Sequence, residues 1–346
     1  MVNFFIVFTL QLTFKLTMEM SNKKLYKILS IDGGGIRGII PALILVEIEK
    51  RTGKAIHELF DLVAGTSTGG ILAVCLNIPN KETRKAAYSA EDLVRLFKRK
   101  AHKIFLQDIW HSIMTGLGMI KEKYSYHGIQ EVLKEYCGDT ELKSALTDIL
   151  LTSYDLNRKQ PFFFKSRTAK KWAKKNFKMR YAIRATTAAP TYFEPFKLLS
   201  MADNKTSYLF VDGGIIANNP AMCAFTEALK LNQSDILMVS LGTGSEEMTY
   251  QDIVNWGLVQ WISPLLMLMV NGNNETVDYQ LREIFSVKPD SDYYRFQVKL
   301  PLENSAFDDI TLENIIFLEN RAKDLIALEN NKIDEICEKL MASGEW

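Results

Sequence analysis

The sequence predicts an α/β fold of three layers (α/β/α), in which helices cover both faces of a mostly parallel central sheet. Two observations lead to this prediction. Short apolar runs that read as strands alternate with segments of helical spacing, and most of these runs end in a glycine-rich turn. The chain has 346 residues, of which 47% are apolar, so it can bury a large core within one unit.

The first two expected strands each lead into a helix. The run Ile28–Ile31 precedes a glycine turn, after which Gly38–Gly53 has its apolar residues at helical spacing. The run Leu62–Ala64 precedes a second glycine turn, and a helix is expected over Gly69–Leu76. Parallel α/β sheets place their sites at the carboxyl ends of the strands, so we expect both turns to lie at a functional edge.

A polar and mostly helical block follows from Lys81 to about Lys143, with a break at Gly116-Leu117-Gly118. Because it stands between expected strands, we expect it to be an inserted cap or lobe. Asp148–Asp155 and Pro161–Lys165 then flank the turn residues Asn157-Arg158, which favours a β-hairpin.

The second half of the chain continues the alternation. Arg180–Ala189 is an expected helix that the following proline ends. Tyr208–Val211 and Ile236–Leu241 are expected strands that each end in a glycine turn, and the helix Pro220–Leu231 lies between them with proline at its first turn. The remainder is mostly helical and charged.

The first 24 residues stand apart from this pattern. The apolar run Phe4–Phe14 has no Lys or Arg before it and no small-residue cleavage site after it, and it is too short to cross a bilayer. Met18 and Met20 offer later start positions, so we favour a dispensable extension over residues 1–24. We expect one catalytic domain over 25–346, with its motifs over 28–244, a helical insertion over about 81–143 and a helical C-terminal region over 245–346.

Charge and cysteine content argue against some classes of function. The 42 Lys and Arg residues balance 41 Asp and Glu residues, so no net field indicates a nucleic acid polymer as partner. The cysteines lie far apart without a CxxC pair, which favours free thiols in a reducing compartment over a disulfide framework or a zinc site. They are Cys75, Cys137, Cys223 and Cys337.

One further apolar stretch is Trp256–Val270, which contains Leu265-Leu266-Met267-Leu268-Met269. It is shorter than a transmembrane helix. The sequence leaves open whether it is a buried helix or a lipid-facing or lid segment.

Gly65-Thr66-Ser67-Thr68-Gly69, between an expected strand and helix, matches the GxSxG pattern of a nucleophile elbow. Side chains at the flanking positions of so sharp a turn would collide with the neighbouring strand or helix, and the two glycines remove that clash. The following helix directs its N-terminal N–H groups at developing negative charge. A tight turn with an incidental serine is the structural alternative, but the strand–turn–helix context favours Ser67 as a nucleophile.

The run Gly33-Gly34-Gly35 is the second element. Consecutive glycines let the backbone approach a ligand and turn its N–H groups toward one point, as an oxyanion hole requires. With Gly38 the same loop also matches the dinucleotide fingerprint, which needs an acidic residue at the end of the next strand. Glu58 and Asp61 precede that strand, so the oxyanion interpretation is favoured.

Arg37 lies in the same loop. It either pins the loop to nearby carbonyl or carboxylate groups or contacts a substrate phosphate. The sequence favours neither role.

The general base decides the type of catalysis. The α/β-hydrolase order Ser…Asp…His is not available if Asp212 is the acid, because every histidine precedes it. None of the histidines lies in a glycine-flanked turn or at a strand end; they are His57, His102, His111 and His127. A carboxylate whose pKa is raised by partial desolvation can take the serine proton directly. Asp212, which follows an expected strand and precedes Gly213-Gly214, is the best candidate.

At these residues the sequence resembles the patatin-like phospholipase family, including its bacterial-type members. The family's three motifs stand in order as Asp32-Gly33-Gly34-Gly35-Ile36-Arg37-Gly38 (DGGGxRG), Gly65-Thr66-Ser67-Thr68-Gly69 (GxSxG) and Asp212-Gly213-Gly214 (DGG). The segment from Ala188 to Pro195 and Asn218-Asn219-Pro220 also agree. The resemblance covers about Ile28–Gly244.

The resemblance implies a patatin-like variant of the α/β-hydrolase fold and a serine-dependent lipid acyl hydrolase of the phospholipase A type, without cofactor or metal. It implies a Ser67–Asp212 dyad and an oxyanion hole formed by Gly33, Gly34, Gly35 and Thr68. The implied substrate is a membrane phospholipid or another lipid ester, met by transient contact of a cytoplasmic protein with the membrane surface. Some bacterial members are effectors or need a nucleotide, so secretion and a small-molecule activator stay open, as does the oligomeric state.

Two alternatives stay open beside this hypothesis. A soluble carboxylesterase or thioesterase of the same fold would prefer dispersed short-chain esters to phospholipid vesicles. A catalytically latent effector that binds a lipid or nucleotide has little support, because no proposed catalytic position has been replaced.

Overall fold

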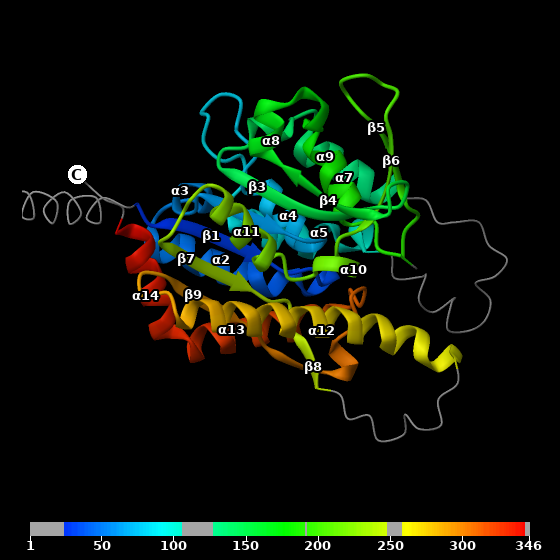
Figure 1. Cartoon of the computed structure of the whole chain (residues 1–346). Helices are drawn as coiled ribbons and strands as arrows, with labels where there is room; N and C mark the ends of the chain where they lie inside the picture. The colour runs from blue at the N-terminus through cyan, green and yellow to red at the C-terminus, as the bar shows by residue number, and fades with distance from the viewer. Residues whose placement is uncertain (1–23, 106–126, 191, 248–257, 343–346) are drawn as a thin grey trace, which may run out of the picture.

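The computed structural model describes residues 24–105, 127–190, 192–247 and 258–342. Residues 1–23, and with them nearly all of the expected extension, lie outside the described part, as do Gly116-Leu117-Gly118 and the first two residues of Trp256–Val270. The described chain forms three layers, with a sheet between two sets of helices (Figure 1). The predicted fold class is therefore confirmed.

The central sheet has the strand order β5-β6-β3-β2-β1-β7-β9, and β4 also pairs with β3. The strands are β1 (Tyr26–Ile31), β2 (Leu62–Gly65), β3 (Asp148–Asp155), β4 (Gln160–Lys165), β5 (Phe196–Leu199), β6 (Ser207–Asp212), β7 (Ile236–Leu241) and β9 (Asp292–Phe296). Neighbours from β3 to β9 in this order run parallel, whereas β4, β5 and β6 pair antiparallel. A separate parallel pair joins β8 (Ser245–Glu247) and β10 (Lys299–Pro301).

Both faces of the sheet are covered, as the burial of β1 shows. All its residues are buried, and successive side chains on a strand point to opposite faces. Leu29 and Ile31 pack into the larger core cluster, and Tyr26 and Ile28 into the smaller. The helices of the larger cluster are α2 (Ile39–Thr52), α3 (Ile56–Leu59), α4 (Thr68–Cys75), α5 (Ala90–Ile104), α7 (His127–Cys137), α8 (Ser166–Lys171), α9 (Met179–Thr186), α13 (Leu312–Leu328) and α14 (Asn330–Met341). Those of the smaller cluster are α11 (Ala221–Lys230) and α12 (Leu258–Ser286).

The block from Lys81 to Lys143 contributes α5 and α7 to the described structure. Ser89 begins α5 with a capping box, because its Oγ accepts the N–H of Asp92 (3.2 Å) and the Asp92 carboxylate accepts the N–H of Ser89 (2.9 Å). Leu93 and Phe97 of α5 are buried in the larger core cluster. α5 packs against α2, and α7 against α9.

The structure differs from the sequence prediction at the end of one helix and at four strands that were not predicted, β5, β8, β9 and β10. The helix expected to end at Ala189 ends at Thr186, because the carbonyl group of Ala188 accepts the N–H of Asp212 (2.9 Å) and the chain is held at the end of β6. β9 lies in a region that we expected to be helical, where it pairs with β7. Its aromatic residues are typical of strands, so the sequence contained a signal for it.

Candidate active site

Ser67 stands at the sharp turn between β2 and α4. Its backbone has φ 52° and ψ −120°, a conformation that costs a residue with a side chain about 1–3 kcal/mol. A Cβ at Gly65 would lie 2.3 Å from the carbonyl oxygen of Gly69, and one at Gly69 would lie 2.2 Å from that of Ile31. The N–H of Ser67 donates to Oγ1 of Thr186 (2.9 Å). The two glycines therefore permit a turn that presents Ser67 at the beginning of a helix.

Asp212 reaches the same edge of the sheet from the opposite direction. β6 is antiparallel to β3, and Asp212 pairs with Ser153 of that strand. Gly65, at the end of β2, pairs with Leu151 of β3. The ends of β2 and β6 thus lie two residues apart along β3. The DGG turn comes to the site on an antiparallel strand, unlike the other two turns.

The environment of Asp212 suits a general base. Asp212 is 4% exposed, and burial raises its pKa to about 6, although hydrogen bonds with the Ser67 side chain and the Gly214 N–H and the charge of Arg184 lower it. The Gly214 N–H donates to Oδ1 over 2.7 Å. A carboxyl group with this pKa is mostly ionised at neutral pH and is a stronger base than an ordinary aspartate.

The glycine loop lies beside Ser67, but its N–H groups are not equivalent. The N–H of Gly33 donates to the carbonyl oxygen of Asn218 (3.2 Å), so it is already engaged. Gly34 and Gly35 line the pocket together with Ser67 and Thr68. No hydrogen bond to another described residue uses the N–H of Gly34, Gly35 or Thr68. These three donors are therefore available to a ligand.

The neighbouring motif glycines complete the three turns. Gly35 has φ 58°, and a Cβ there would lie 2.0 Å from the carbonyl oxygen of Phe307, so this position requires glycine. Gly38 ends the short helix that follows the loop. Gly213 precedes α10 (Gly214–Ala217), which begins directly beyond the carboxylate of Asp212.

The pocket around Ser67 holds about 860 Å³, part of it open to solvent. Its walls are mainly apolar and include Ile104, Phe105, Ile129, Phe193, Val270 and Phe307. The first three belong to the expected insertion, and Val270 belongs to the apolar stretch Trp256–Val270. Ala189, Pro190, Tyr192 and Phe193 of the segment from Ala188 to Pro195 also line it, whereas Thr191 lies outside the described residues. Such a lining suits a hydrocarbon chain.

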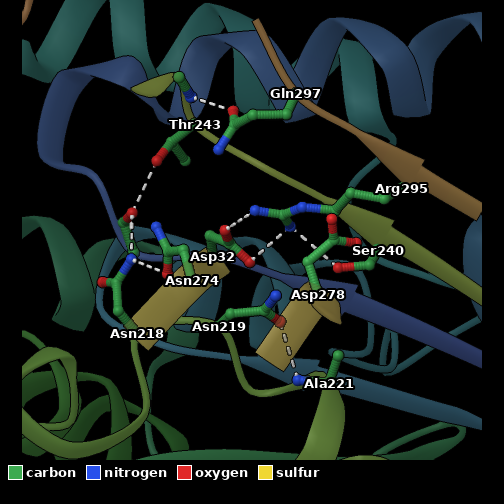
Figure 2. Close-up of polar contacts among 12 residues, drawn as sticks. Asp32, Asn218, Asn219, Ala221, Ser240, Thr243, Asn274, Asp278, Arg295 and Gln297 are labelled. Atoms are coloured by element: carbon green, nitrogen blue, oxygen red, sulfur yellow. Dashed lines mark hydrogen bonds and ion pairs between the residues drawn. The ribbon is translucent and has the colours of Figure 1, made fainter. Parts of the chain in front are cut away.

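Arg37 and Asp32 hold the loop from within the protein. Arg37 is 1% exposed, its Nη1 donates to the carbonyl oxygen of Ser305 (3.0 Å), and its guanidinium lies 4.3 Å from the centre of the Phe307 ring. Burial lowers the pKa of Arg37 to about 10. Of the two roles left open, these contacts match the one in which Arg37 pins the loop. Asp32 is fully buried and pairs with Arg295 of β9 through contacts of 2.6 and 3.0 Å (Figure 2).

No described histidine side chain lines this pocket. His57 is half-buried in α3 (Ile56–Leu59), and His102 is exposed in α5. His111 lies outside the described residues, and the structure does not describe the side chain of His127.

Sequence reasoning did not single out three residues around the glycine loop (Figure 2). Thr243 contacts the loop at Gly33, Arg295 pairs with Asp32 at its start, and Asn274 accepts a hydrogen bond from Asn218. Thr243 stands in the turn Gly242-Thr243-Gly244, which the sequence marked only as the end of a strand. Asn274 lies within a helix and Arg295 within a strand that was not predicted, so neither stands in a motif or glycine turn that marks a site.

Known proteins are similar to this chain over most of its length. The family model for patatin-like phospholipase matches residues 29–225. "Probable inactive patatin-3-Kuras 1" of Solanum tuberosum is 31% identical over 91% of this chain and 91% of that protein. "Patatin-like protein 2" of Arabidopsis thaliana is 31% identical over 87% of this chain and 83% of that protein. Among solved structures, VipD from Legionella pneumophila is 12% identical, with 89% of this chain and 67% of that chain covered at a TM-score of 0.44. The chain therefore belongs to the patatin-like phospholipase family.

Proposed function

We propose that this chain is a lipid acyl hydrolase of the phospholipase A type, with Ser67 as nucleophile and Asp212 as general base. One observation carries the proposal: the buried carboxyl group of Asp212, whose pKa burial raises to about 6, lines the same mainly apolar pocket as Ser67. Membership of the family supports a lipid hydrolase in general terms. One relative is named as probably inactive, but in this chain both proposed catalytic residues stand in their motifs.

The reaction would proceed through an acyl-enzyme. Asp212 takes the proton of the Ser67 hydroxyl while Oγ attacks the ester carbonyl carbon. The N–H groups of Gly34, Gly35 and Thr68 stabilise the tetrahedral oxyanion; Gly33 is no longer included, because its N–H is bonded to Asn218. The C–O bond then breaks, and the leaving alcohol takes the proton from Asp212. Water deprotonated by Asp212 then attacks the acyl carbon of the acyl-enzyme. The bond from that carbon to Oγ breaks and Oγ takes the proton back from Asp212, which releases the fatty acid and restores Ser67.

A lipid surface would meet the protein beside the pocket. Leu265, Leu268 and Met269 of α12 are 51%, 37% and 51% exposed, and the next residue, Val270, lines the pocket. These exposures support the lipid-facing interpretation of Trp256–Val270 over a buried helix. No described helix is long and apolar enough to cross a bilayer. All four cysteines are free, as predicted, which supports a reducing, cytoplasmic setting for this peripheral contact.

The test is hydrolysis of phospholipid vesicles by the purified protein, with products identified by mass spectrometry. Wild type should release fatty acid and lysophospholipid, Ser67→Ala and Asp212→Asn should not, and Ser286→Ala, at an exposed serine, is the matched control. Full activity of Ser67→Ala would refute the proposal. Activity confined to dispersed short-chain esters would instead indicate the soluble esterase, and activity that appears only with an added small ligand would indicate the latent effector.

A further inference from the structure

A set of polar side chains holds the glycine loop. The carbonyl oxygen of Gly33 accepts hydrogen bonds from Oγ1 of Thr243 (2.7 Å) and Nδ2 of Asn218 (3.3 Å). Nδ2 of Asn218 also donates to Oδ1 of Asn274 (3.0 Å). Figure 2 shows Thr243 and Asn218 turned toward the same point of the loop, with Asn274 bonded to Asn218. We call Thr243, Asn218 and Asn274 the carbonyl clamp.

The register of the sheet brings Thr243 to this position. In the parallel pair of β1 and β7, Ile31 lies opposite Leu241, and the N–H of Asp32 donates to the carbonyl oxygen of Leu241 (3.0 Å). Gly33 and Thr243 are each two residues beyond that pair, so they leave the sheet side by side. Thr243 also packs against the loop, because a Cβ at Gly34 would lie 2.2 Å from its Oγ1.

The clamp fixes the direction of the Gly34 N–H. The peptide bond between Gly33 and Gly34 is trans, so its carbonyl oxygen and its N–H point in opposite directions. The carbonyl oxygen is turned toward Thr243 and Asn218, and the N–H therefore points away from them. Gly34 and Asn218 line the pocket, whereas Thr243 and Asn274 do not, and the N–H of Gly34 has no hydrogen-bond partner among the described residues. This N–H is therefore free to donate to a ligand in the pocket.

We propose that Thr243 and Asn274 are positioning residues of the oxyanion hole. Thr243 holds the Gly33 carbonyl directly and Asn274 holds it through Asn218, so that the Gly34 N–H is aimed at the oxyanion before substrate binds. This inference rests on the proposed function. Glycines have the largest conformational freedom of any residue, so three in a row need an external restraint if their donors are to be preorganised. Thr243 is 1% exposed and Asn274 4% exposed, and both lie beyond residue 225, where the family match ends.

The test is Thr243→Val, which keeps the shape of the side chain and removes its hydroxyl donor. With a soluble short-chain ester, kcat should fall about ten-fold or more while KM stays within about two-fold, because the donor acts on the transition state. Thr243→Ser, which restores the hydroxyl, should recover kcat to within about three-fold of wild type. Asn274→Ala, which removes the second partner of Asn218, should show the same split with a smaller loss.

Two further readouts separate positioning from general damage. Among the described residues, neither Thr243 nor Asn274 forms a hydrogen bond with Asp212, so the acid limb of the kcat/KM profile should keep its midpoint near pH 6 in each variant. A trifluoromethyl ketone forms a tetrahedral oxyanion with an active serine, so its inhibition constant should weaken in parallel with kcat/KM. Thr147→Val is the matched control, because its hydroxyl donates to the carbonyl oxygens of Phe60 (2.8 Å) and Asp61 (3.0 Å) before β3 begins. It should leave kcat unchanged.

A folded Thr243→Val with wild-type kcat would overturn the inference, and so would a rise in KM alone or a loss of rate that moves the acid limb. If Thr243→Val does not fold, the same measurements on Asn274→Ala test the inference instead. Wild-type protein that hydrolyses no ester would refute the proposed function. An active wild type beside an unaffected Thr243→Val would refute only the role of the clamp.

Discussion

Replacing Asp212 with asparagine should abolish ester hydrolysis and, at neutral pH, stabilise the fold. Asparagine has nearly the shape of aspartate, and its Oδ1 can keep the hydrogen bond from the Gly214 N–H (2.7 Å). In the wild type, burial raises the pKa of Asp212 from 3.8 to about 6. The ionised carboxylate that the reaction needs is therefore the form that the folded protein disfavours.

The sign and the size of the effect follow from proton linkage. A carboxyl group with a higher pKa in the folded chain than in the unfolded chain contributes stability below pH 3.8, and this contribution is lost as the pH rises through about 6. Two pKa units at about 1.4 kcal/mol each correspond to about 3 kcal/mol. Asparagine does not titrate. The free energy of unfolding of Asp212→Asn should therefore exceed that of wild type by up to about 3 kcal/mol near pH 7.5 and by almost nothing near pH 4.

The assay is denaturant unfolding of both proteins at these two pH values. Asp203→Asn is the matched control, because hydrogen bonds from the N–H groups of Thr206 and Lys205 hold the pKa of Asp203 well below its usual range. That variant should lose stability at neutral pH. An Asp212→Asn protein less stable than wild type near pH 7.5 would refute the reasoning about burial, and full hydrolytic activity would refute the role of Asp212 as base.

Three other perturbations test separate parts of the site. Wild-type kcat/KM should be about ten-fold below its plateau near pH 5 and level off above pH 7, because Asp212 must be ionised to take a proton; a flat profile would contradict this. Gly35→Ala should lower the thermal midpoint and abolish activity, since φ is 58° and the new Cβ would lie 2.0 Å from the Phe307 carbonyl oxygen; a stable, active variant would be incompatible with the loop geometry. Arg295→Met should cost about 3–5 kcal/mol in chemical unfolding, because Asp32 would remain buried without its partner. Adding Asp32→Asn should recover part of that loss, and no recovery would argue against the ion pair as the cause.

The strands that position the site were predictable because they are buried on both faces. All residues of β1 and β7 are buried, so each appears in the sequence as a continuous or nearly continuous apolar run. β9 was missed because four of its five residues, Asp292 to Arg295, are only partly buried and include charges. Its place in the sheet comes from pairing with β7, which local sequence does not encode.

The sequence likewise located some residues of the candidate site and missed others. Ser67 and Asp212 stand in short motifs whose glycines mark sharp turns, so the sequence located them. It did not reveal which N–H groups of the glycine loop face the pocket, because that depends on the bond from Gly33 to Asn218. Thr243 and Asn274 act through the register of β1 with β7 and through the packing of α12, which only the folded chain specifies.

The claim that Ser67 and Asp212 form the catalytic dyad of an ester hydrolase is tested most directly by labelling with a fluorophosphonate and locating the adduct by peptide mass spectrometry. We expect one adduct, on Ser67, that forms in step with the loss of lipid hydrolysis, with much slower labelling of Asp212→Asn and none of Ser67→Ala at that position. Hydrolysis that survives complete labelling of Ser67, or an active protein whose Ser67 stays unlabelled, would contradict it.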